Sequence, residues 1–326
     1  MMTAVAEVHD RAELHVHING AIPASTVREI LADEATVLPS GFEIERDLLR
    51  LGPCESLASY LAPWQILRLF PRTQLNLERL SVAVVASLAA NRVRFVELRS
   101  SVLYLATLQK CSPAQALERL IESTRGAAER CGIRRGLILT VTRGDYAAVS
   151  LAALLQAYQD LGEPSDVVGI DLAGDEEIGY PTELPSLFLA AKERFGLGIT
   201  IHAGETGRVE NVRAAVELFG ADRIGHGTAA GKDPELLDLL ARKDICVEVC
   251  PISNRLTGAV PPKEAHPLRR FRQFGVPFVI CSDNPAIHQR GLADDQAAAM
   301  AEGLSTSDMQ DQFEMAKRYS FMEDLD

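Results

Sequence analysis

The chain has 326 residues, of which 47% are hydrophobic and 24% charged, so it can bury a large core and is not an intrinsically disordered chain. Its formal net charge of −12 repels polyanions, which argues against nucleic-acid or anionic-membrane partners and favours a small-molecule ligand. No segment approaches the roughly 20 apolar residues of a membrane span, and the start lacks the basic and apolar regions of a signal peptide, so we expect a cytoplasmic protein.

Short apolar, β-branched runs recur along the chain, and helical periodicity follows them. The predicted strands begin at residues 12, 95, 135, 167, 198, 223, 245 and 276. Ser112 with Pro113 and Asp233 with Pro234 are typical helix starts. Repeated strand–helix units predict an α/β fold, the (β/α)8 TIM barrel, because strands buried on both faces need helices outside them. An open doubly wound sheet is the alternative, but its glycine-rich G-x-G-x-x-G loop does not occur.

One interval in this pattern is much longer than an ordinary connection between a strand and a helix. It follows the first predicted strand and contains the segment LASYLAPWQILRLF (57–70) with the only tryptophan. We predict a helical insertion over residues 19–90 that covers the barrel mouth; packing away from the mouth is the alternative. No repeat or linker marks a second domain, so residues 1–326 are expected to form a single barrel domain.

Histidine and acidic residues gather where the predicted strands end, the edge at which barrel enzymes carry their chemistry. They are His15, His17, His202, Glu205, His226 and Asp283. Taken singly, each has an ordinary structural explanation, such as a hydrogen-bonded core histidine or a turn aspartate. Taken together, burying so many titratable groups without a counter-ion would be costly.

A divalent metal resolves that cost. Three imidazoles and one carboxylate, from His15, His17, His202 and Asp283, suit zinc with an open position for water. A closed structural site would use pairs of cysteines, and the six cysteines form no C-x-x-C pair. Because zinc lowers the pKa of bound water to about 7, the pattern predicts metal-assisted hydrolysis. Iron, cobalt or manganese could fill the same ligand set.

The motifs HVHINGAI, VVGIDLAGDE, TIHAGE, DRIGHGT, CPISNRLTG and SDNP follow one another along nearly the whole chain. In this order they resemble the adenosine deaminase family of the amidohydrolase superfamily. The resemblance implies a metal-dependent hydrolase barrel with one Zn²⁺ per chain. It also implies hydrolytic deamination of the 6-amino group of adenosine or a closely related purine nucleoside, giving the inosine-type product and ammonia.

Carried over position by position, the resemblance implies that zinc is held by His15, His17, His202 and Asp283. Glu205 would protonate the purine ring at N1, and His226 would orient and deprotonate the attacking water, so that Glu205, His226 and Asp283 form the catalytic group. Gly174 would offer its backbone N–H to the ring, a close approach that glycine permits.

Two positions depart from the family pattern, because Asn19 and Asn284 stand where many members carry aspartate. Both remain candidate substrate-binding residues. An asparagine amide at residue 284 could still donate to N7 of a purine. At residue 19 the loss of a carboxylate weakens a contact to a free 5′-hydroxyl and removes repulsion against a 5′ anion. A 5′-modified or phosphorylated adenosine derivative, of the AMP or N6-methyl-AMP type, is therefore the alternative substrate.

Other readings stay open beside this one. Candidate phosphate partners are Arg68, Arg72 and Arg143, although each also suits a solvated surface position. Another amidohydrolase acting on an aminated ring is a second alternative, but the two-metal type would need a lysine where the chain has DLAGDEE. A purine-binding protein without catalysis would have lost a ligand, Glu205 or His226, and a nucleic-acid deaminase would carry an H-x-E and P-C-x-x-C signature. No oligomeric state is predicted.

Overall fold

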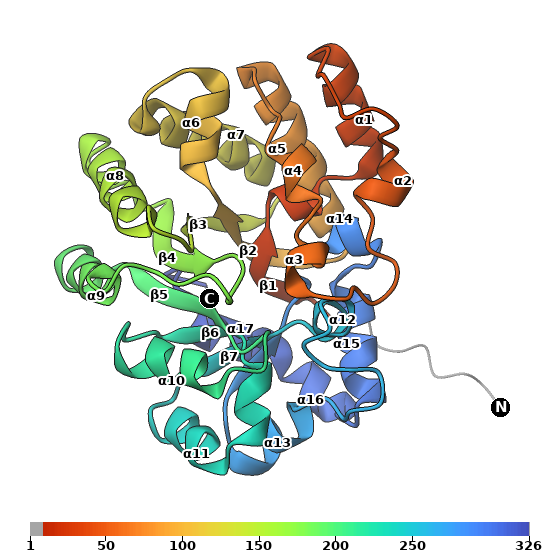
Figure 1. The fold of residues 1–326 in the computed structure, drawn as a ribbon, viewed down its shortest axis with the longest axis vertical. Helices are drawn as coiled ribbons and strands as arrows, with labels where there is room; N and C mark the ends of the chain where they lie inside the picture. Colours follow the sequence, from red (N-terminus) through yellow and green to blue (C-terminus); the bar gives the residue numbers. More distant parts are fainter. Residues whose placement is uncertain (1–8, 326) are drawn as a thin grey trace.

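The computed structural model describes residues 9–325 and contains one sheet whose parallel strands pair in chain order, ringed by helices (Figure 1). The strands are β1 (Arg11–His17), β2 (Val93–Ser100), β3 (Arg134–Thr142), β4 (Val167–Ala173), β5 (Gly198–Ala203), β6 (Arg223–His226), β7 (Cys246–Val249) and β8 (Phe278–Ile280). Each overlaps a predicted run, which confirms the (β/α)8 barrel.

Helices occupy the intervals between the strands. They are α1 (Ala24–Asp33), α2 (Ile44–Asp47), α3 (Leu57–Tyr60), α4 (Trp64–Leu67), α5 (Gln74–Ala90), α6 (Val102–Gln109), α7 (Pro113–Cys131), α8 (Ala147–Asp160), α9 (Leu184–Phe195), α10 (Val209–Glu217), α11 (Pro234–Arg242), α12 (Pro251–Leu256), α13 (Leu268–Phe274), α14 (Pro285–His288), α15 (Leu292–Ala301), α16 (Thr306–Gln310) and α17 (Gln312–Tyr319), with single turns η1 (Asn19–Ala21) and η2 (Thr228–Lys232). Within residues 9–325, no helix is long and apolar enough to cross a membrane.

The helix starts follow the local sequence. The Ser112 hydroxyl accepts a hydrogen bond from the backbone N–H of Gln115, whose side chain accepts from the N–H of Ser112 in return. The Asp233 carboxylate likewise accepts from two backbone N–H groups in the first turn of α11. Because these groups have no partner within the helix, the caps fix where α7 and α11 begin.

The barrel closes where the first strand meets the segment after the last one. β8 ends at Ile280, but the chain continues alongside β1, and the backbone N–H of His17 donates to the carbonyl of Asp283 at 3.0 Å. The N–H of Asp283 donates to the carbonyl of His15 at 2.9 Å. Closure therefore places the Asp283 side chain beside two histidines from the other end of the sequence.

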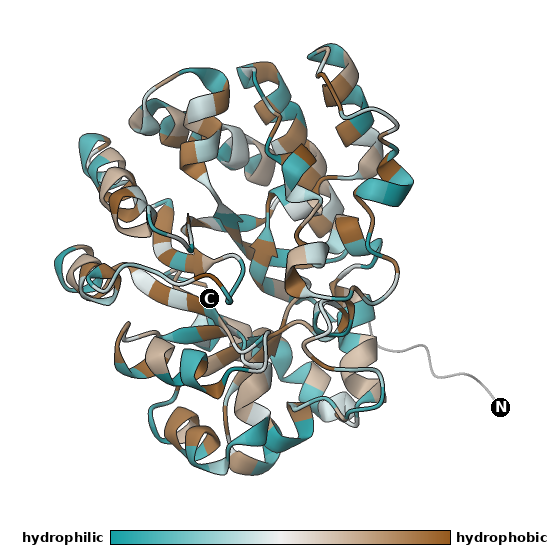
Figure 2. Cartoon of the chain, in the orientation of Figure 1, coloured by the Kyte–Doolittle hydropathy of each residue, from teal (hydrophilic) through white to brown (hydrophobic). Residues whose placement is uncertain are grey.

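The apolar core lies between the sheet and the helices, and apolar residues concentrate on the helix faces that pack against the strands (Figure 2). The centre of the barrel is charged instead. Its fully buried charged side chains include Glu13, Glu97, Arg99, Asp171, Arg223 and Glu248. Buried charges are tolerated when they are paired, and Arg223 pairs with both Glu97 and Glu248.

The predicted insertion is helical, with α1 to α5 between β1 and β2. Its residues Leu57, Tyr60 and Trp64 line the cavity at the barrel mouth. All six cysteines are free, and Cys246, Cys250 and Cys281 are buried in the core.

Candidate active site

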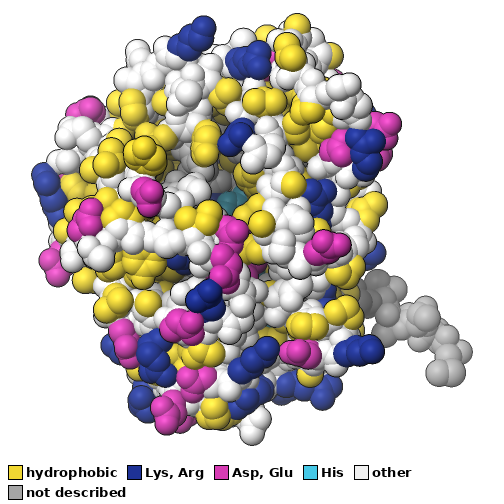
Figure 3. Space-filling model, viewed as in Figure 1, with side chains coloured by type: hydrophobic (Ala, Val, Ile, Leu, Met, Phe, Trp, Pro, Cys, Tyr) yellow, Lys and Arg dark blue, Asp and Glu magenta, His cyan; other side chains and the backbone are white. Residues whose placement is uncertain are grey.

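A cavity of about 320 Å³ opens at the carboxyl ends of the strands, and Figure 3 shows a hollow on this face with a histidine inside it. The predicted site residues that line it are His17, Asn19, Gly174, His202, Glu205, His226, Asp283 and Asn284. His15 lies fully buried directly against this group. Sequence positions as distant as 15 and 284 therefore meet in one place.

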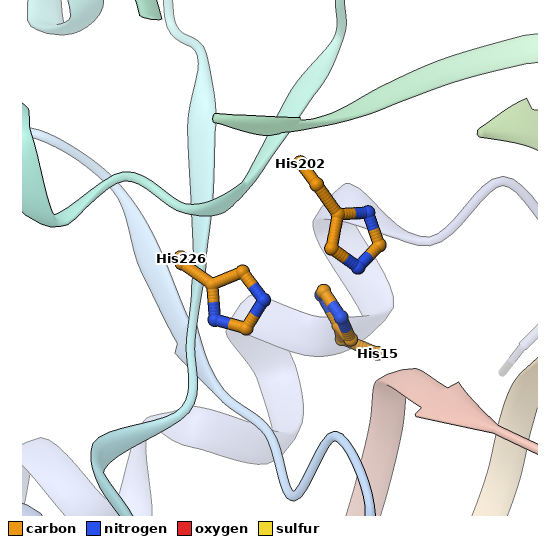
Figure 4. Close-up of side chains that lie close together, drawn as sticks. All are labelled: His15, His202 and His226. Atoms are coloured by element: carbon orange, nitrogen blue, oxygen red, sulfur yellow. The ribbon is translucent and has the colours of Figure 1, made fainter. Parts of the chain in front are cut away.

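The imidazole rings converge from different strands, as Figure 4 shows for His15, His202 and His226. Nε2 of His17 lies 3.1 Å from Nε2 of His202. Oδ1 of Asp283 lies 3.6 Å from Nε2 of His15 and 3.5 Å from Nε2 of His17. Two overlapping sets have ligand atoms within 4.8 Å of one another: His15, His202 and His226, and His15, His17 and Asp283.

Two buried carboxylates orient the rings from outside the cluster. Nδ1 of His15 lies 2.8 Å from Oε2 of Glu248, and Nδ1 of His202 lies 2.9 Å from Oδ1 of Asp171. A carboxylate accepts the Nδ1 proton, which leaves the Nε2 lone pair of each ring facing the centre. The sequence analysis missed both acids. The available signal was a single carboxylate inside an apolar strand, in VGIDLA and in CVEV.

These donors fit a zinc ion. Nε2 of His15 is buried and has no hydrogen-bond partner among the described residues. Nε2 of His202 carries a lone pair toward the Nε2 of His17, a contact that a shared cation would stabilise. A cluster of nitrogen lone pairs with one carboxylate is the donor set that zinc prefers, whereas calcium and magnesium prefer oxygen.

Electrostatics separate the protonation states in the site. Burial lowers the pKa of His17 to about 3, with the neighbouring His202 adding to the effect. Although burial alone would raise it, the pKa of Asp283 lies well below its ordinary value because of the nearby imidazoles, first among them that of His15. Burial likewise lowers the pKa of His202, whereas the neighbouring carboxylates of Asp283 and Glu248 outweigh burial and raise that of His15. At neutral pH His17 and His202 therefore offer neutral rings beside an ionised carboxylate.

Glu205 is held at the cavity wall by its own backbone. Oε1 of Glu176 accepts from the N–H of Glu205 at 2.7 Å, and Oε2 accepts from the N–H of Gly204 at 2.9 Å. Burial, followed by the charges of Glu176 and Asp283, raises the pKa of Glu205 well above its ordinary value. The Glu205 carboxyl thus retains its proton at a pH where an exposed glutamate has lost it.

His226 lies between Glu205 and a polar chain behind it. Its Nε2 is 3.6 Å from Oε2 of Glu205, and its Nδ1 is 3.0 Å from Nδ2 of Asn254. Oδ1 of Asn254 lies 3.1 Å from Nε2 of His266, which is also buried. Burial and the charge of His15 lower the pKa of His226 well below its ordinary value, so its ring is neutral at pH 7.

Two of these residues have strained backbones. His226 has φ = 65° and Asp283 has φ = 59°, the left-handed region that residues other than glycine seldom adopt. Such strain costs of order 1–3 kcal/mol and persists where the surroundings enforce it. His226 is the last residue of β6 and Asp283 lies three residues beyond β8, and both line the cavity.

The substrate-binding candidates differ in how free they are. Gly174 has φ = 100° and lines the cavity, and an added Cβ would lie 3.2 Å from a methyl of Thr142.

The two asparagines are held by other residues. The side-chain amide of Asn19 donates to the carbonyl of Leu67 at 3.3 Å, which ties the end of β1 to the insertion. The amide of Asn284 donates to the hydroxyl of Tyr60 at 2.9 Å. Tyr60, which the sequence analysis did not single out, also contacts His288 at 2.7 Å.

The arginines considered as phosphate partners do not gather at the cavity. Arg68 lines it from an exposed position and bonds Gln65. Arg143 is buried and donates to the carbonyl of His202 at 2.7 Å, and neither it nor the exposed Arg72 lines the cavity.

Comparison with known proteins agrees with this geometry. The adenosine deaminase family model matches residues 10–325. The chain belongs to the adenosine deaminase family. Its sequence is 32% identical over 281 residues to the adenosine deaminase of Clostridium botulinum, covering 85% of this chain and 83% of that one.

Solved structures share the fold of this family member. The Arabidopsis N6-mAMP deaminase has a TM-score of 0.83 at 24% identity, covering 97% of this chain and 95% of that one. A Burkholderia ambifaria amidohydrolase with bound zinc has a TM-score of 0.86 at 22% identity, covering 99% and 90%. The family membership makes the chain an aminohydrolase, a hydrolase acting on C–N bonds, as the sequence predicts.

Proposed function

We propose that the chain catalyses zinc-dependent hydrolytic deamination of the 6-amino group of adenosine or a closely related purine nucleoside. One observation carries this proposal: the histidine and aspartate ligand atoms and the protonated carboxyl of Glu205 lie at the same cavity. Nε2 of His226 is 3.6 Å from that carboxyl. Glu205 can then protonate a ring nitrogen of the substrate, and the imidazole of His226 can orient the water that attacks the neighbouring carbon.

One Zn²⁺ per chain would be held by His15, His17, His202 and Asp283. When bound, zinc supplies a water-derived nucleophile at neutral pH by lowering the pKa of water to about 7. The acids Glu248 and Asp171 keep the rings of His15 and His202 in the required tautomer. The overlapping group of His15, His202 and His226 leaves His226 near enough to hold the attacking water in place.

The remaining chemistry is proton transfer by the protein. Glu205 donates its proton to N1 of the purine, which makes C6 electrophilic, and the neutral ring of His226 accepts a proton from the attacking water. A C–O bond forms at C6, the amino group takes up the remaining proton of the added hydroxyl, the C6–N bond breaks, and ammonia leaves with a carbonyl at C6. The proton held by His226 then restores the Glu205 carboxyl, 3.6 Å away. Asp283 keeps its negative charge throughout, which stabilises the cationic form of His226 after it has taken the proton.

Three further residues would position the substrate. The backbone N–H of Gly174 would meet the purine ring, where a side chain would block the approach. Asn284 would present its second amide N–H to N7, since the first is used by Tyr60. Asn19 would face the 5′ end of the ribose from the carboxyl end of β1.

The alternative substrate is a 5′-modified or phosphorylated derivative of adenosine. The Arabidopsis relative is named for N6-mAMP, which supports a nucleotide as a candidate, and Asn19 lacks the charge that would repel a 5′ phosphate. The experiment is steady-state kinetics of the zinc-loaded protein with adenosine, AMP, N6-methyl-AMP and adenine, monitored by ultraviolet absorbance. Turnover of a 6-aminopurine supports the proposal, and a lack of turnover across this panel would move it to another aminated ring.

A further inference from the structure

The cavity extends beyond the predicted site residues into an apolar lobe. Its wall is formed by Phe70, Leu77, Leu80, Leu105, Leu108 and Leu120, from α5, α6, α7 and the segment after α4. We call this part of the cavity the leucine lobe. Phe70, Leu77, Leu80 and Leu120 are at most 2% exposed, so the lobe is built from core side chains and is continuous with the site.

The leucine lobe lies on the side of the barrel that follows β1 and β2. Glu205 and Gly174, which would hold the purine ring, follow β5 and β4. Asn19 follows β1, and Ser100 and Ser101 at the end of β2 also line the cavity. A nucleoside with its ring at Glu205 and its ribose near Asn19 therefore directs its 5′ carbon toward the lobe.

The charges around the lobe do not suit a phosphate. Among the described lining residues, the arginines are Arg68, which is exposed and bonded to Gln65, and Arg99, which is fully buried and paired with Asp171 and Glu248. The lining carboxylates are Asp175, Glu205 and Asp283. A phosphate would thus enter an apolar lobe in a cavity with a single accessible cation, at a desolvation cost.

Asn19 does not favour a free 5′-hydroxyl either. Its amide donates to the carbonyl of Leu67, so part of its hydrogen-bonding capacity already serves the insertion. An aspartate at this position could not donate to that carbonyl and would repel it. The asparagine is therefore explained by the attachment of the insertion, without a hydroxyl ligand.

Together these observations lead us to infer that the substrate is a 6-aminopurine ribonucleoside with an apolar 5′ substituent, such as a thioether, which fills the leucine lobe. The inference rests on the proposed function and deepens it. One additional methylene in a hydrophobic pocket changes kcat/KM by about 10- to 200-fold. Replacing the 5′-hydroxyl by an alkylthio or arylthio group should have an effect of this size.

The test compares kcat/KM of the zinc-loaded enzyme for adenosine, AMP, 5′-methylthio-5′-deoxyadenosine and 5′-phenylthio-5′-deoxyadenosine. We expect at least one thioether to exceed both adenosine and AMP by about 10-fold or more. Equal or higher values for adenosine or AMP would overturn the inference while leaving deamination intact.

A pair of variants separates the lobe from general damage to the fold. Leu108→Gln places a polar amide in the lobe and should reduce the kcat/KM ratio of thioether to adenosine about 10-fold. Leu103→Gln, also half-buried on α6 but not lining the cavity, should leave that ratio unchanged. A ratio that both variants change equally, or that Leu108→Gln leaves unchanged, would contradict the assignment.

Binding measured without turnover distinguishes this inference from the proposed function. Calorimetric titration would compare inosine with 5′-phenylthio-5′-deoxyinosine, neither of which carries an amino group to lose. Tighter binding of the thioether by about 10-fold supports the leucine lobe even if no substrate is deaminated. Equal or weaker binding of the thioether contradicts it even if adenosine is deaminated.

Discussion

The strand ends and the leucine lobe form two parts of the wall of one cavity and differ in polarity. On the strand side, His15 and His202 are each oriented by a carboxylate, and the backbone of Glu205 is held by Glu176. Opposite in character is the leucine lobe, which the insertion shares with α6 and α7 and which consists of apolar side chains. The paired charges fix which protons and lone pairs are available, and hence the reaction, whereas the apolar wall decides which substrate substituents can be buried.

The largest expected effect is the loss of catalysis when the Glu205 carboxyl is removed from the strand side. Glu205→Gln keeps the shape of the side chain and leaves the hydrogen bond between Glu176 and the backbone N–H of residue 205 in place, but it cannot donate a proton to N1. We expect kcat to fall about 10²- to 10⁴-fold while zinc content, measured by elemental analysis, stays unchanged. Glu210→Gln, on the exposed first turn of α10, is the matched control. A near wild-type rate for Glu205→Gln would show that the acid is another group.

A smaller loss should follow from disturbing the carboxylate behind a ligand. Asp171→Asn weakens the acceptor for Nδ1 of His202 and removes a charge paired with Arg99. Zinc affinity, measured by competition with a chelator, should fall about 10- to 100-fold. Asp160→Asn, exposed at the end of α8, should retain wild-type affinity. Unchanged affinity in Asp171→Asn would mean that the ring of His202 needs no such support.

The cost of burying Glu205 should appear in the pH dependence of stability. Burial raises the pKa of Glu205 in the folded protein above its value in the unfolded chain. Below the unfolded-state pKa the residue is protonated in both states and costs no stability. As the pH rises from there toward the folded-state pKa, the unfolded chain ionises first, so the free energy of unfolding decreases. Glu205→Gln lacks this loss. In metal-free protein, its free energy of unfolding in urea should match wild type below about pH 4 and exceed it increasingly above, by up to about 1.4 kcal/mol per pH unit.

If wild type instead gained stability relative to Glu205→Gln as the pH rises, the pKa of Glu205 would be lowered by folding, which contradicts the prediction. Glu210→Gln, whose side chain is exposed, should follow the wild-type curve throughout.

The smallest expected effect concerns the junction between the two walls. Asn19→Asp removes the hydrogen bond to the carbonyl of Leu67 and restores a carboxylate near the 5′ end. The kcat/KM ratio of adenosine to a 5′-thioether should rise roughly 2- to 12-fold, the range of one hydrogen bond. Asn91→Asp, between α5 and the start of β2, controls for the added charge. An unchanged ratio would mean that residue 19 has no part in recognising the 5′ end.

Much of the strand side could be predicted because its signals are local. Apolar runs ended by His15 and His17, or by His202, identify both a strand and its functional end, and the family motifs fix their order. Asp171 and Glu248 could not be assigned partners in the same way. Their partners come from other strands, and that pairing depends on the register of the closed barrel.

The insertion could be predicted only as a helical region. Its length and the segment 57–70 indicate helices near the mouth, but the contacts of Tyr60 with Asn284 and His288 join positions more than 200 residues apart. The leucine lobe is likewise invisible in sequence, since leucines that line a cavity have the same periodicity as leucines that fill a core.

The central claim is hydrolysis of a 6-aminopurine by a metal-dependent site, and the most direct measurement is ammonia release by the purified protein. Adenosine and its 5′-thioethers would be incubated with zinc-loaded, chelator-treated and zinc-restored enzyme, and ammonia would be quantified against the inosine-type product. We predict equimolar ammonia and product, loss of both on chelation and recovery on adding zinc. A protein that binds zinc stoichiometrically yet releases no ammonia from these nucleosides would contradict the account.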